Sequence, residues 1–349
     1  MTSGIGGLPA DRDQALVVSP DSPRPAAGPG TRSRSASITG ILGIVVAVLA
    51  VGFCARVLVR EWPHVTAALR HANVPLLVTA ALVGAAAMWL LAVLWWRCLA
   101  VFGSPRRVRD VSTWFFAGEL GKYLPGGIWP VVGRGELARR GGVPRSTAYA
   151  TTVLSLALMC VGAGIASGIL VPVLVLVGGR LGPELLLIAL VPLGLAMIHP
   201  AVLGRLLAML ARVSRGRVRL QAPAWGQMLG LIALSVPTWL AVGGASAVIT
   251  QALGFGQQPA RVAFAAIVAW ILGFLVLPVP AGAGIRELMF VAICGLSAGP
   301  ATVVATMARI VFIVVDGTAG TTALLMLRRH RGRPAGPPQE ADAGGPERR

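Results

Sequence analysis

The hydrophobic positions of this chain fall into long continuous stretches, which short polar and arginine-rich segments separate. A stretch of about 20 apolar residues is long enough to cross a bilayer as a helix. Six stretches of this kind are expected to be full spans, at residues 38–58, 73–96, 147–169, 183–203, 227–252 and 301–327. The pattern therefore predicts an all-α fold, a polytopic membrane helix bundle.

Two further apolar segments, 111–137 and 261–297, are each broken by proline and glycine, at 125–127 and 278–282. Proline removes a backbone donor, and glycine admits a positive φ. We expect both segments to enter and leave the membrane on one side, because arginine-rich loops then stay in the cytoplasm. The prediction is six full spans and two re-entrant broken-helix hairpins, with both termini cytoplasmic.

The two broken segments also resemble each other. Arg-Gly-Glu-Leu at 134–137 follows the first break, and Arg-Glu-Leu at 286–288 follows the second. Three predicted spans separate the copies, and an odd number inverts the second copy relative to the first. Paired, broken apolar segments of opposite orientation indicate an inverted repeat and a transporter-type site near the bilayer midplane.

Composition narrows the class of protein further. The chain is 55% hydrophobic and 13% charged, which excludes an ordinary soluble domain of 349 residues. Its net charge of +18 comes from arginines that flank apolar stretches, which favours membrane topology over nucleic-acid binding. The four cysteines form no C-x-x-C pair, so we expect no metal site and no cofactor.

Charged residues inside the apolar segments are the candidate chemistry. A charge near the bilayer centre costs about 2.5 kcal/mol or more, so such residues face a cavity and pair with one another. Lys122 is the only lysine of the chain, which suggests a site that needs a compact ammonium group. The candidates of this kind are Glu119, Lys122, Arg134, Glu136, Arg286, Glu287, Arg309 and Asp316.

Two interpretations of these charges stay open. Arg309 and Asp316 are seven residues apart and share one helix face. The cations suit a phosphate, and the carboxylates either neutralise unliganded cations or hold a cationic headgroup. Alternatively, Arg134 with Glu136, and Arg286 with Glu287, only hold their loops in place.

The sequence G-E-L-G-K-Y-L-P-G at 118–126, the R-G-E that follows, and P-V-P-A-G-A-G-I-R-E at 278–287 resemble the lysylphosphatidylglycerol synthase transmembrane family. The resemblance extends over about 38–327. It implies a flippase-like inner-membrane domain that, in the best-understood members, moves aminoacylated phospholipid between leaflets. Those members carry a soluble aminoacyl-transferase domain after the membrane part, and we expect this chain to lack it. The motif positions are Lys122, Pro125, Gly126, Arg134, Glu136, Pro280, Gly282, Arg286 and Glu287.

The resulting hypothesis is a flippase-like protein of the bacterial plasma membrane that is not itself an enzyme. It has a disordered basic cytoplasmic arm (1–37), an integral membrane domain (38–327) and a disordered cytoplasmic tail (328–349). Its partners are membrane lipids, bound by a phospholipid or lipid-linked headgroup, and no nucleic acid. One alternative is a lipid-modifying transferase with Glu119 or Glu136 as its base. Another is a non-transporting partner of a separately encoded envelope-synthesis enzyme.

Overall fold

A computed structural model describes residues 72–124, 128–176, 223–256, 258–275 and 284–331, with a few single residues elsewhere. The predicted first and fourth spans, the N-terminal arm and residues 332–349 of the C-terminal tail lie outside these ranges. So do four of the candidate site residues, which belong to the two breaks: Pro125, Gly126, Pro280 and Gly282. The first four residues of the C-terminal tail, 328–331, are helical and not disordered as predicted, because the last helix continues through them.

Four helices of the described part are long and apolar enough to cross a membrane, and this part contains no strand. They coincide with the second, third, fifth and sixth predicted spans. The all-helical, multi-pass membrane fold is therefore confirmed. The four helices are α2 (Val74–Val101), α5 (Arg145–Leu176), α8 (Trp225–Ala252) and α11 (Ala298–Arg331).

Helices α2 and α8 pack along each other and run antiparallel. The backbone N–H of Asn73, which precedes α2, donates to the carbonyl of Ala252 at the end of α8 at 2.8 Å. Trp95 of α2 is fully buried in the core. Helix α2 therefore faces protein at that turn. Trp239 of α8 is also buried, and its indole N–H donates to the carbonyl of Met159 in α5 at 2.8 Å.

Helix α5 is longer than the span predicted at 147–169. It continues through Pro172 to Leu176. Proline is tolerated inside membrane helices because neighbouring groups satisfy the freed carbonyl. The close approach to α8 occurs at Gly162, where an added Cβ would lie 2.2 Å from Oγ of Ser235.

The first broken segment forms two short helices that pack against each other. Helix α3 (Val108–Glu119) passes into the 3-10 turn η1 (Leu120–Tyr123), and α4 (Trp129–Arg140) follows. Glycine allows the close contact, because a Cβ on Gly118 would lie 2.9 Å from the backbone nitrogen of Arg134. This contact positions Arg134 beside the end of α3.

Replacing Gly118 by alanine is expected to destabilise the protein by about 1–3 kcal/mol, since a backbone atom cannot move aside as a flexible side chain can. A matched control is Gly230→Ala in α8, where an added Cβ meets nothing within 4 Å. The control is expected to be neutral or slightly stabilising. Chemical denaturation of both variants in detergent measures the difference, and equal stabilities would contradict the expectation.

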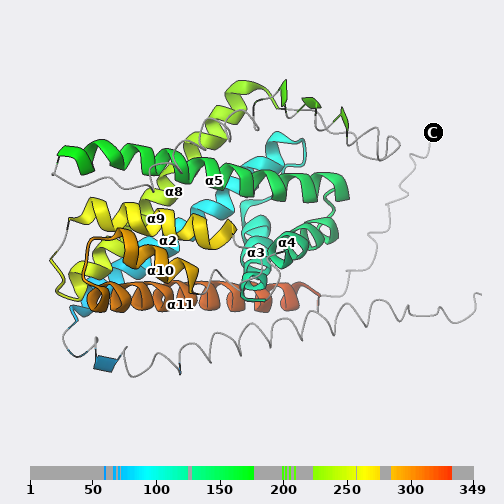
Figure 1. The fold of residues 1–349 in the computed structure, drawn as a ribbon. Coiled ribbons are helices and arrows are strands. Elements are labelled where there is room, and N and C mark those ends of the chain that lie inside the picture. Colours follow the sequence, from blue (N-terminus) through cyan, green and yellow to red (C-terminus); the bar gives the residue numbers. More distant parts are fainter. Residues whose placement is uncertain are drawn as a thin grey trace, which may run out of the picture. The chain divides into compact units, whose positions relative to one another are not determined.

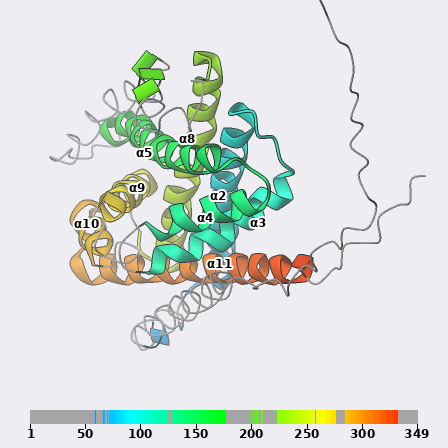
Figure 2. The same cartoon turned by 90° about the vertical axis from the view of Figure 1, so that its right-hand side faces the viewer.

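The second broken segment forms helices α9 (Pro259–Leu275) and α10 (Ile285–Ile293), which pack against each other. Gly284 precedes α10 with a φ of +85°, a conformation that favours glycine. Figures 1 and 2 show α11 passing beside α10 with its first half and beside α3 with its second. The last helix is thus the element that both broken segments share.

Candidate functional site: a buried charge network along the last helix

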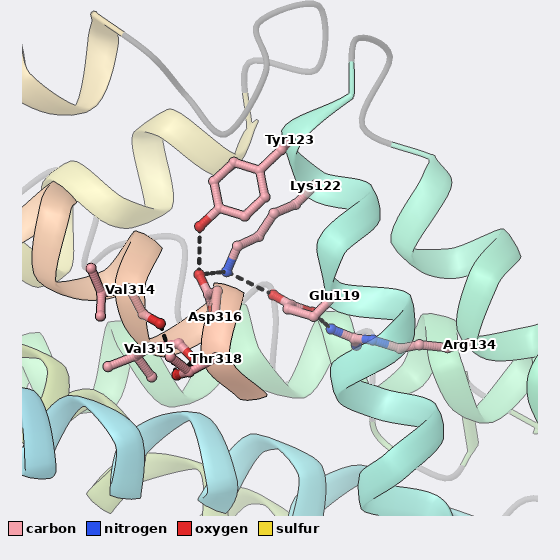
Figure 3. Close-up of polar contacts among 8 residues, drawn as sticks. All are labelled: Glu119, Lys122, Tyr123, Arg134, Val314, Val315, Asp316 and Thr318. Carbon is pink, nitrogen blue, oxygen red and sulfur yellow. Dashed lines mark hydrogen bonds and ion pairs between the residues drawn. The ribbon is translucent and has the colours of Figure 1, made fainter. Parts of the chain in front are cut away.

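Asp316 of α11 binds two side chains of the first broken segment, Lys122 and Tyr123. Its Oδ2 lies 2.7 Å from Nζ of Lys122 and accepts a hydrogen bond from the hydroxyl of Tyr123, also at 2.7 Å. Lys122 in addition donates to Oε1 of Glu119 at 3.1 Å. Figure 3 shows these side chains converging from the end of α3, from η1 and from α11. Lys122, the only lysine of the chain, therefore bridges two carboxylates from separate helices.

Glu119 extends the network to α4 through Arg134, whose Nη2 donates to Glu119 Oε2 (Figure 3). The guanidinium of Arg134 also lies 4.0 Å from the centre of the Phe115 ring. Glu119, Arg134 and Asp316 are buried. We call Glu119, Lys122, Arg134 and Asp316 the first charge cluster. It holds two cations and two carboxylates, so its formal charge is zero.

The second broken segment contributes another ion pair to α11. Oε1 of Glu287 lies 2.6 Å from Nη1 of Arg309, while Oε2 accepts the backbone N–H of Gly284 at 2.7 Å. Glu287 thus caps the first turn of α10 and anchors it to the last helix.

Arg286, next to Glu287, is held differently. Its guanidinium lies 5.2 Å from the centre of the Trp270 ring and 5.4 Å from that of the Phe312 ring. Within the described ranges it forms no ion pair. Nζ of Lys122 lies 5.6 Å from the same Trp270 ring centre. One indole of α9 therefore contacts a cation from each broken segment.

A small pocket adjoins this second group. It has a free volume of about 10 Å³, which is room for about one water molecule. Arg286 and Glu287 line it together with small residues of α9 and α11. The complete lining is Ser246, Ala266, Ala269, Arg286, Glu287, Phe290, Ala305 and Ala308.

Glu136 lies apart from the network. Its carboxylate accepts hydrogen bonds from Arg139 and Arg140 at 2.8 Å on the outer side of α4. These hydrogen bonds lower the pKa of Glu136 to about 2, and the bond from Arg139 has the largest effect. The pairs of the alternative interpretation, Arg134 with Glu136 and Arg286 with Glu287, do not form in the described part of the chain, because residues one or two apart on a helix do not face each other.

Three residues of this region could not be identified as site residues from the sequence. Tyr123 lies inside the first motif, but nothing in its neighbourhood singles out its hydroxyl. Trp270 and Phe312 have apolar neighbours in the sequence, where an aromatic residue is typical of the core. In the part of the chain that the structure describes, no three His, Cys, Asp or Glu side chains gather as a metal site would require.

An all-helical membrane domain with two broken helical segments and a buried charge network defines the class of this protein as a multi-pass membrane protein. The chain matches the family model "Lysylphosphatidylglycerol synthase TM region" over residues 40–320, so it belongs to that family. The comparison with curated proteins gave no match.

Proposed function

We propose that this protein is a flippase-like lipid transporter that binds a phospholipid or lipid-linked headgroup between its two broken segments. The observation that carries the proposal is the meeting of both segments at α11 and Trp270. Asp316 binds Lys122 of the first, Arg309 binds Glu287 of the second, and Trp270 contacts Lys122 and Arg286. The family's relation to membrane lipids supports the lipid as ligand.

The cost of buried charge supports a function for the network. Seven ionisable side chains occupy apolar helices, where each charged group is expensive. Ion pairs of this kind contribute little net stability compared with apolar packing of the same volume. Costly charges of this kind, gathered where two broken helical segments meet one helix, support a transport site.

The proposed topology follows the sequence prediction. Six spans and two re-entrant hairpins form an inverted repeat in the bacterial plasma membrane, with both termini in the cytoplasm. The four described spans and the two broken segments support this arrangement. A headgroup bound between hairpins that enter from opposite faces would be reachable from either leaflet in turn.

Transport is favoured over a transferase reaction by the state of the carboxylates. The two proposed general bases, Glu119 and Glu136, are each ion-paired to arginine. Such pairing stabilises the ionised carboxylate and makes it a weak base. We therefore propose that the chain is not an enzyme, and that any envelope-synthesis enzyme it serves is a separate protein.

The test is lipid translocation in proteoliposomes, measured by dithionite quenching of NBD-labelled phospholipids. The wild type is expected to move label between leaflets faster than protein-free vesicles do. Arg286→Ala is expected to lower the rate at least about tenfold, since a charge-assisted contact is worth about 1.5–3 kcal/mol. The matched control is Arg145→Ala, because Arg145 also lies over an aromatic ring, that of Tyr149, but outside the network. A wild-type rate equal to that of empty vesicles for every lipid tested would refute the proposal.

A further inference from the structure

Every carboxylate of the network is already neutralised by a cation of the chain itself. Glu119 is paired with Lys122 and Arg134, and Asp316 with Lys122. Glu287 is paired with Arg309. An ammonium group on a bound headgroup would therefore compete with a buried cation for each carboxylate, and the one carboxylate oxygen of the network that forms no hydrogen bond among the described residues, Oδ1 of Asp316, is itself buried.

The cations are in excess by one. The network holds Lys122, Arg134, Arg286 and Arg309 against Glu119, Glu287 and Asp316, a difference of four minus three. The excess falls on Arg286, because the other three cations each have a carboxylate within hydrogen-bond distance. Aromatic faces hold the Arg286 guanidinium in place but offer no carboxylate to its N–H donors.

Two further donors of the same region lack a partner among the described residues. Nη2 of Arg309 and Nε1 of Trp270 are buried and form no hydrogen bond. Buried polar groups are normally hydrogen-bonded, and an unsatisfied one costs about 1–3 kcal/mol. Trp270 contacts Arg286, and Arg309 pairs with the residue next to Arg286. The region thus offers an excess of donors and one excess positive charge.

A small pocket lies beside these residues. Arg286 and Glu287 line it, and four alanines form much of the remaining wall. The volume of this pocket is large enough for a water molecule but not for a whole headgroup. A phosphate oxygen at the pocket's edge would accept hydrogen bonds from Arg286 without entering fully.

We propose that Arg286 is the phosphate-binding residue of a headgroup site that selects net-anionic lipids and discriminates against aminoacylated, ammonium-bearing ones. The inference rests on the proposed function for the identity of the ligand as a lipid. Phosphate oxygens bind the guanidinium edge, for which arginine is well suited. The first charge cluster has a formal charge of zero, so it holds the first broken segment to α11 and contributes no net charge to the headgroup site.

Native mass spectrometry of the full chain in detergent measures binding apart from transport. The probes are dioctanoyl phosphatidylglycerol, phosphatidylcholine, lysyl-phosphatidylglycerol and inorganic phosphate. Phosphatidylglycerol is expected to bind the wild type at least about tenfold more tightly than the other three. In Arg286→Gln its affinity is expected to fall about 10-fold to 100-fold, as for loss of a charge-assisted hydrogen bond. Arg286→Lys is expected to keep part of the preference, and Arg145→Gln all of it.

Each other outcome overturns the inference. Lysyl-phosphatidylglycerol binding as tightly as phosphatidylglycerol would show that the ammonium finds a carboxylate. Inorganic phosphate binding equally well would make this an anion site without a lipid. An unchanged preference in Arg286→Gln, with its unfolding midpoint equal to that of the wild type, would remove Arg286 from the site. If Arg286→Gln is less stable, loss of the preference in Arg286→Lys as well would do the same. Selective binding without translocation would refute the proposed transport and leave the anionic selectivity intact.

Discussion

Replacing Lys122 by methionine is expected to destabilise the protein by about 3–5 kcal/mol. Glu119 keeps its partner Arg134, but Asp316 loses its cation, and its side chain is only 1% exposed. Removing one partner of a buried pair leaves an uncompensated charge, and this is the dominant cost. Tyr123 still donates to Asp316, but a neutral hydroxyl does not replace a charge. Chemical denaturation in detergent measures the loss.

The double variant Lys122→Met with Asp316→Asn separates this explanation from simple loss of packing. It removes both charges together, so most of the stability lost by either single variant is expected to return. The exposed pair of Arg140 with Glu136 provides the control, since Arg140→Met is expected to change stability by at most about 1 kcal/mol. Additive losses in the double variant would show that Lys122 and Asp316 do not act as a pair.

The helical elements could be predicted from the sequence because their signals are local. Long apolar stretches predicted α2, α5, α8 and α11, although Pro172 proved compatible with a continuing helix. Proline and glycine predicted the two breaks, and short helices lie on either side of each. The six-span count and the inverted repeat remain predictions.

The pairing of the charges could not be predicted in the same way. Asp316 and Tyr123 are 193 positions apart, and no local pattern connects them. The sequence suggested Arg134 with Glu136, but helix geometry directs these two side chains apart. Arg134 instead reaches Glu119, because Gly118 lets α4 approach α3. The expectation that buried charges would pair was sound, whereas the choice of partners depends on helix packing.

Trp270 contacts a cation from each of the two broken segments, although its own neighbours in the sequence are apolar. Its ring contacts Lys122 and Arg286, and it packs edge-to-face on Trp239 with ring centres 5.4 Å apart. A desolvated cation–π contact is worth about 2 kcal/mol. The ring therefore stabilises two cations that belong to different segments and would otherwise repel each other.

Trp270→Leu is accordingly expected to lower lipid translocation at least about tenfold, because Arg286 loses one of the two rings that hold it. Trp270→Phe keeps an aromatic face and is expected to retain a rate within about threefold of the wild type. The dithionite assay measures both rates, and unfolding midpoints show whether the fold survives. Trp270→Leu transporting at the wild-type rate would mean that the ring does not position the cations. Equal losses in both variants would instead assign the effect to the indole N–H, the one polar group that phenylalanine lacks.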